Sequence, residues 1–241
     1  MNYKNKIWSI SSFLIVLTFF PNIAAQNLDI RKNSFYFPHN IGSIKYLHTA
    51  GIKSANLPED IVESDDNFRA PLIFYDFKFG LLNEFSFDGG IETNFITVQF
   101  KLGPKWSHEL GKFTFSVGGN AAYYVGALNQ FDFKTQIYGW LVYPNLTIGY
   151  EFPRFSVSLE SELILAIDQT SKTGDVEVAN NVKTLSGFSV TAYIEQPLWK
   201  DNFLVIGLKA NFTKFYYPIW ASFSTFDRLY FIPEVIFSFN L

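Results

Sequence analysis

The chain has 241 residues, no cysteine and a formal net charge of −3. The lack of cysteine excludes disulfides, thiolate metal sites, cysteine nucleophiles and the acylated cysteine of a lipoprotein, and the mildly acidic charge argues against nucleic-acid binding. Phe and Tyr occur 28 and 13 times, while charged residues make up only 17% of the chain. This composition is unusual for a soluble core and suits β-structure at a membrane surface.

The first 25 residues have the three parts of a secretory signal peptide. Lys4 and Lys6 form the positive region, residues 7–20 are apolar, and a short small-residue stretch ends at Ala25. The apolar run is shorter than the roughly 20 residues of a membrane helix, so a membrane anchor is the weaker alternative. We expect cleavage after Ala25, export through the Sec pathway, and an N-terminal periplasmic segment over 26–43.

Ten segments after residue 43 alternate between apolar and polar residues. The last is the clearest, because Phe231, Val235, Phe237 and Phe239 alternate with polar residues such as Glu234. A repeat of two residues gives a strand one apolar face and one polar face. We expect strands at 44–55, 69–82, 84–92, 96–107, 112–126, 137–151, 155–168, 184–197, 203–216 and 228–241.

A soluble sandwich shows the same alternation, so strand length and connection length are needed to separate it from a membrane barrel. Most of the expected strands have about 11 to 15 residues, whereas soluble strands cluster near 5 or 6 and tilted membrane strands need at least about 9. With a periplasmic N-terminus, every second connection is a tight turn, as in outer-membrane barrels. Aromatic residues near the strand ends resemble the girdles of such barrels. They are Trp106, Tyr150, Phe152 and Trp199 toward one end, and Tyr123, Tyr138, Trp140, Tyr216, Tyr217 and Trp220 toward the other.

These features predict an all-β fold, a closed antiparallel up-and-down transmembrane β-barrel over residues 44–241 with about 10 strands, within a range of roughly 8 to 12. No later run is long enough for a membrane helix, and in a membrane only a helix or a closed barrel satisfies every backbone polar group. The first strand is the weakest, because His48 falls on its apolar face. Eight strands with an N-terminal lid are the alternative.

The signal segment, the aromatic-rich strands and the final stretch from Val235 to Leu241 resemble the bacterial outer-membrane β-barrel superfamily. In that family the last strand usually closes on an aromatic residue; here Leu241 replaces it, while Phe237 and Phe239 keep the outward rhythm. The resemblance implies a location in the bacterial outer membrane, in contact with its lipid and lipopolysaccharide. It also implies a periplasmic chaperone and the barrel-insertion machinery as assembly partners.

The chain offers little for acid–base catalysis, since its three histidines are His39, His48 and His108 and none falls in a predicted outer loop. Barrel enzymes such as omptin-like proteases, outer-membrane phospholipases and lipid A palmitoyl-transferases place a histidine near the outer rim or membrane edge. We therefore expect no enzyme and no cofactor, with a barrel-rim hydrolase or acyltransferase as the alternative.

Charged residues of both signs fall on the predicted inner face, where unpaired charges are costly. Barrels of about eight strands are filled by side chains, and open channels usually have 16 or more. We therefore expect a filled lumen and a structural or ligand-contacting role for the outer loops. The alternative is a narrow passive channel or transporter for ions, small or apolar solutes. The expected lumen residues are Asp76, Lys78, Asp88, Glu92, Lys101, Lys105, Glu160, Glu162, Glu195, Lys209 and Glu234.

The connection between the first two strands is acidic. It is a candidate divalent-ion loop, although its spacing matches no EF-hand and a solvated acidic loop is the simpler interpretation. No other metal site is expected. The acidic residues are Glu59, Asp60, Glu63, Asp65 and Asp66.

Overall fold

The computed structural model of the protein describes residues 33–58, 61, 69–130, 133–174, 176–180, 185–198, 202–222 and 228–241. The expected signal peptide and the five acidic residues of the candidate divalent-ion loop lie outside these ranges. Within them, no helix is both long enough and apolar enough to cross a membrane.

The described chain forms eleven strands and one short 3₁₀ helix, η1 (Tyr217–Ser222). Each of the ten expected strand segments overlaps one of these strands. The additional strand, β8, lies in the connection between β7 and β9. The strands are β1 (Tyr46–Asn56), β2 (Arg69–Gly80), β3 (Phe85–Thr93), β4 (Thr97–Leu110), β5 (Phe113–Gln130), β6 (Phe133–Glu151), β7 (Ser156–Thr173), β8 (Val176–Asn180), β9 (Leu185–Pro197), β10 (Phe203–Thr213) and β11 (Tyr230–Asn240).

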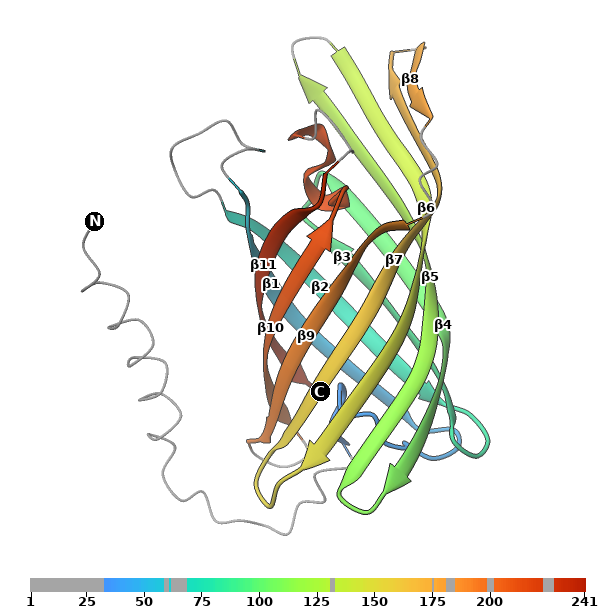
Figure 1. Ribbon diagram of the computed structural model, residues 1–241, viewed down its shortest axis with the longest axis vertical. Coiled ribbons are helices and arrows are strands. Elements are labelled where there is room, and N and C mark those ends of the chain that lie inside the picture. Colours follow the sequence, from blue (N-terminus) through green and yellow to red (C-terminus); the bar gives the residue numbers. More distant parts are fainter. Residues whose placement is uncertain are drawn as a thin grey trace, which may run out of the picture.

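Ten of these strands close into an antiparallel barrel (Figure 1). Each strand pairs with the next in the chain, except that β7 pairs with β9 across the short β8. The ring closes between β1 and β11, from Thr49 opposite Asn240 to Ala55 opposite Glu234. The closed barrel predicted from the sequence is therefore confirmed, and the alternative of eight strands with a lid is wrong.

The first strand fits the ring although it contains His48. This residue points outward and lies beside the outer-face rings of Tyr46 and Tyr75, at centroid distances of 5.3 and 5.8 Å. Its imidazole thus sits among aromatic side chains on the outside of the wall. The interior positions of β1 are filled by residues such as Leu47 and Thr49, which are buried.

The wall is apolar outside and mostly polar inside, because its side chains alternate with a period of two. Exposure alternates almost perfectly along β2 and β11. On β11, Phe231, Phe237 and Phe239 are exposed, whereas Glu234 and Ser238 are buried. Because the ring has no open edge, this alternation gives a continuous apolar outer surface around a polar interior.

The two ends of the barrel differ. Four short connections lie at one end, which we call the turn end, at 81–84, 111–112, 152–155 and 198–202. At the opposite end, the loop end, β5, β6 and β7 continue past their other neighbours and, together with β8, form a projecting sheet (Figure 1). The last pair between β4 and β5 is Thr97 with Gly126, so residues 127–130 pair with β6 alone.

Candidate functional site

Among the described residues, the interior of the barrel is held by ion pairs that start from five lysines on β1, β2, β4 and β10. Lys101 Nζ lies 3.1 Å from Asp76 Oδ1, and Lys209 Nζ lies 2.9 Å from Glu162 Oε2. Since a buried charge is costly without a partner, each of these pairs compensates two interior charges at once.

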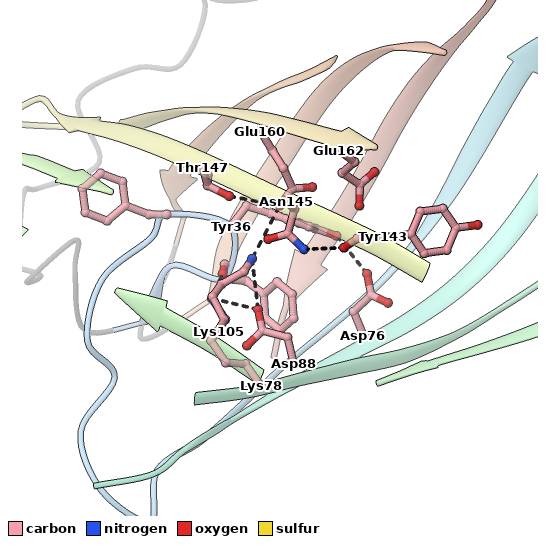
Figure 2. A network of polar contacts seen from close by, with 12 residues as sticks. Tyr36, Asp76, Lys78, Asp88, Lys105, Tyr143, Asn145, Thr147, Glu160 and Glu162 are labelled. Carbon is pink, nitrogen blue, oxygen red and sulfur yellow. Dashed lines mark hydrogen bonds and ion pairs between the residues drawn. The ribbon is translucent and has the colours of Figure 1, made fainter. Parts of the chain in front are cut away.

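Lys105 on β4 joins two carboxylates from different parts of the ring. Its Nζ lies 3.2 Å from Asp88 Oδ2 on β3 and 3.5 Å from Glu160 Oε2 on β7, as Figure 2 shows. Lys78 lies 3.8 Å from the same oxygen of Asp88, and Glu160 also accepts a hydrogen bond from Thr147. Two lysines and two carboxylates thus form one network.

One interior lysine was not expected from the sequence. Lys53 on β1 forms an ion pair and a hydrogen bond with Glu92 on β3. The signal that could have revealed it is its distance from His48. Lys53 follows His48 by five positions, and an odd offset places two strand residues on opposite faces. An outward His48 therefore requires an inward Lys53.

Two interior carboxylates, Glu195 and Glu234, lie outside this lysine pairing. In the part of the chain that the structure describes, no lysine forms an ion pair with either. Both are nevertheless buried. Each is instead satisfied by neutral donors, and each receives some of them from a segment that enters the barrel from one end.

The segment that enters from the turn end is formed by residues 33–41, which we call the plug. The backbone N–H groups of Phe35 and Phe37 donate to the two carboxylate oxygens of Glu195, both at 2.7 Å. The Asn240 amide on β11 donates to the same carboxylate at 3.1 Å. The plug therefore supplies the donors that this carboxylate would otherwise take from a lysine or from water.

Side chains of the plug also contact the lumen wall. Tyr36 stacks on Tyr193 of β9, with centroids 4.0 Å apart and an interplanar angle of 8°, and its hydroxyl donates to Asp76 at 3.4 Å. The Phe37 ring has an exposed fraction of 0%, and full burial of such a ring contributes about 1.5–3 kcal/mol. The ring fits against β6 because residue 149 is a glycine. A Cβ at Gly149 would lie 2.7 Å from the Phe37 ring.

The segment that enters from the loop end is formed by residues 215–222, which include η1 and which we call the cap. Tyr216 donates to Glu234 at 2.9 Å and Tyr217 donates to Glu92. Trp220 is buried over Gly126, where a Cβ would lie 2.4 Å from the indole nitrogen. Both closures thus rest on a lumen carboxylate and on a glycine of the wall.

The cap corrects one sequence prediction. Tyr216, Tyr217 and Trp220 were expected in the outer aromatic girdle, but they lie inside the barrel, because β10 ends at Thr213 and the chain then turns inward. Burial, together with the nearby carboxylates, raises the pKa of Tyr216 and of Tyr217 well above the ordinary value of a tyrosine. Both therefore remain neutral hydrogen-bond donors over the physiological pH range.

A cavity of about 60 Å³ lies in the lumen beside the cap, whose residues Phe215, Tyr216 and Tyr217 line it. Its size leaves room for a few water molecules, since one water needs about 10–15 Å³ of such volume. Charged groups of both signs and tyrosine hydroxyls surround it. They include Lys53, Glu92, Lys101, Glu162, Lys209 and Tyr143.

The structure places all eleven charged residues expected in the lumen on the inner face, and it brings most of them together in the networks above. Glu160 and Glu162 do not act as a carboxylate pair, because they contact different lysines. Among the described residues, no group of three or more His, Asp or Glu side chains could hold a metal ion.

The histidines lie in separate places. His108 contacts Glu84 at the turn end, with 2.7 Å between Nδ1 and Oε1. His39 lies in the plug, where its Nδ1 is 2.9 Å from the backbone oxygen of Phe37. The sequence assigned residues 26–43 to an N-terminal periplasmic segment, and the structure places Phe35 and Phe37 of this segment against Glu195 in the lumen. The aromatic run Phe35 to Phe37 was the available signal.

No family model and no curated protein sequence matches the chain. Among solved structures, the chain is similar to the translocator domain of autotransporter NalP from Neisseria meningitidis, with 10% identity, a TM-score of 0.45 and coverage of 81% of this chain and 87% of that one. It is also similar to Neisserial surface protein A (12% identity, TM-score 0.35, coverage 81% and 96%). It is similar as well to outer membrane phospholipase A from Escherichia coli, with 9% identity, a TM-score of 0.36 and coverage of 88% of this chain and 95% of that one. The fold assignment rests on the strand pairing within this chain.

Proposed function

We propose that the protein is a bacterial outer-membrane barrel that is closed to ion flow and that acts through its loop end, in a structural or ligand-contacting role. The observation that carries this proposal is the occupation of the lumen from both ends, with ion pairs between the two closures. A path for ions would have to displace the plug, separate the pairs and displace the cap. We propose no catalytic role.

The outer surface supports the location in a membrane. Large apolar side chains cover the outside of the ring, and a continuous apolar surface of this size is unfavourable in water. Aromatic pairs lie toward both of its edges, as in the girdles of membrane barrels. At the turn end Phe113 contacts Tyr150, and at the loop end Tyr123 contacts Trp140, with centroids 4.7 and 5.0 Å apart.

The projecting sheet supports a contact role at the loop end. It extends beyond the closed ring and includes Thr135, Gln136, Thr170, Ser171 and Lys172, which are polar. In an outer-membrane barrel with the turn end in the periplasm, this sheet faces the outside of the cell. It is therefore the part of the molecule that we expect to meet a ligand or another surface.

Planar-bilayer recording tests the closed state. The full chain, reconstituted in parallel with a 16-stranded porin as the conducting control, should give no stepwise current, because its lumen is filled. Steady single-channel currents from the purified chain would contradict the proposal. Membrane fractionation tests the location, and recovery of the processed chain as a detergent-free soluble monomer would contradict it.

The second candidate is a narrow cation-biased path, favoured by Glu195 and Glu234, with which no described lysine forms an ion pair. It requires currents from the unmodified chain. Neutralisation of Glu160, Glu162 or Glu195 should then shift the reversal potential in a salt gradient toward weaker cation preference. An unchanged reversal potential would exclude these residues from an ion path.

A further inference from the structure

We propose that the turn end of the lumen is a binding site for a short, bent aromatic peptide, and that Ser34 to Phe37 of this chain are its resident, exchangeable ligand. This inference does not depend on whether the barrel conducts. It follows from how the lumen wall contacts the plug, and it identifies a peptide as the chemical class that the site accepts.

The first argument is that the wall recognises the peptide backbone. The Glu195 carboxylate accepts from two N–H groups of the plug, those of Phe35 and Phe37. Lys78 Nζ donates to the backbone oxygen of Phe35 at 2.7 Å. Both wall residues are buried and come from strands, so their positions are fixed by the barrel. Contacts with backbone groups do not require one particular sequence.

The second argument is that the wall has defined places for aromatic side chains. Tyr36 stacks on Tyr193, and the Lys78 ammonium lies 5.3 Å from the centre of the Phe35 ring. Phe37 occupies the space over Gly149. Backbone recognition combined with places for side chains is an arrangement by which proteins bind peptide segments.

The third argument concerns the connection between the plug and β1. This connection contains Gly42 and Ile44 with φ of +81° and +64°. A left-handed conformation is unfavourable for a β-branched residue such as Ile44. The connection is therefore held in a strained conformation between the docked plug and β2, where the Ile44 N–H donates to the backbone oxygen of Gly80 at 3.0 Å.

The fourth argument is that an empty site would lack specific hydrogen-bond donors. Without the plug, Glu195 would keep the Asn240 amide as its neutral donor and lose the two backbone donors. A buried carboxylate with missing donors is unfavourable. A second peptide that adopts the same bend and offers N–H groups at the same spacing would restore them, which is the basis for exchange.

Thiol labelling in the full chain tests the proposal, because the chain has no cysteine of its own. Ser34 has an exposed fraction of 0%, so Ser34→Cys is a nearly isosteric buried reporter. Ser43 is exposed, so Ser43→Cys is the matched accessible control. In folded protein we expect Ser34→Cys to react with a maleimide at least about tenfold more slowly than Ser43→Cys, as a docked state favoured by 1.4 kcal/mol or more requires. Equal rates would overturn the docked plug.

Substitutions of lumen carboxylates test the site itself. Glu195→Gln keeps the shape but replaces one acceptor by a donor that opposes a plug N–H, so it should raise the Ser34→Cys rate about tenfold. Glu234→Gln removes the other unpaired carboxylate, which contacts the cap, and should leave that rate unchanged. An equal response to both substitutions would indicate general loosening of the barrel and contradict a specific peptide site.

A peptide competitor tests exchange. A synthetic peptide with the sequence of residues 33–41 should raise the Ser34→Cys rate, because it occupies the site whenever the resident segment leaves. The same peptide with Tyr36→Ala lacks the ring that stacks on Tyr193 and should be clearly less effective. No acceleration by the native peptide at millimolar concentration would overturn the exchangeable ligand.

Discussion

The plug and the cap close opposite ends of one barrel by different means. The plug is bound through backbone N–H groups that donate to Glu195, whereas the cap is bound through the side-chain hydroxyls of Tyr216 and Tyr217. The cap is also joined to a strand at each side, to β10 and to β11. The plug reaches a strand at its C-terminal side, through the strained connection at Ile44.

Two segments that are buried to a similar degree therefore need not leave the lumen with equal ease. Displacement of the cap requires a loop fixed at two strands to swing outward. Withdrawal of the plug requires a turn of the chain around the connection to β1. We therefore expect the turn end to open before the loop end under any perturbation that affects both equally.

The largest effect should come from crowding each closure by one methyl group. Gly149→Ala places a Cβ against Phe37, and Gly126→Ala places one against Trp220. The plug should respond by leaving, which exposes the Ser34→Cys reporter and lowers the unfolding free energy by the lost burial of Phe37, about 1.5–3 kcal/mol. The cap cannot leave, so Gly126→Ala should lower the unfolding free energy by up to about 3 kcal/mol, a typical cost of overpacking.

Urea titration in detergent micelles, followed by tryptophan emission, measures this free energy. Gly119→Ala is the control, because a Cβ at Gly119 meets no atom closer than 3.7 Å. The comparison between the ends fails if Gly149→Ala destabilises the whole barrel while the Ser34→Cys reporter stays protected.

A smaller effect should come from removal of the cap hydroxyls. Tyr216→Phe and Tyr217→Phe each delete a hydrogen bond to a buried carboxylate, at a cost of about 1–2 kcal/mol. The control is Tyr143→Phe, which loses a hydrogen bond from the neutral Gln99 amide and should cost less. The same urea titration measures all three. None of these variants should expose the plug reporter, and faster labelling of Ser34→Cys in them would show that the two ends are coupled.

The smallest effect should come from Ile44→Gly. Glycine accepts the left-handed conformation without steric cost, and the Ile44 side chain is 84% exposed, so little packing is lost. After subtraction of the extra flexibility of glycine in the unfolded chain, we expect a gain of about 0.5–1 kcal/mol. The gain should appear as a higher urea midpoint together with slower labelling of Ser34→Cys. A lower midpoint would show that this connection carries no strain.

The strands and their faces could be predicted from the sequence, because alternation is local and the outer side is apolar in nearly every strand. The inner position of Glu195 followed from the same alternation. Its hydrogen-bond partners could not be predicted, since they are backbone N–H groups of a segment 158 or more positions away. Almost every residue type carries such a donor, so the sequence does not reveal which one is used.

The cap shows a second limit of sequence reasoning. Tyr216, Tyr217 and Trp220 have the composition of a girdle, and composition does not distinguish an aromatic residue on the outer face from one that folds back over the lumen. The direction of the chain after Thr213 decides the matter, and it depends on the room left by Gly126 on a strand far away in the sequence.

The interior ion pairs have a consequence for how the barrel assembles. Lys53 and Glu92 join β1 to β3, Lys101 and Asp76 join β4 to β2, and these pairs skip the strand between them. The register of these strands is thus fixed by hydrogen bonds to the neighbouring strand and by an ion pair to the strand beyond it. A slip of one strand by one residue would turn its row of charges to the apolar outer face and break its ion pairs with strands that had not moved. Misaligned closure is therefore penalised at two distances, which favours a single final register.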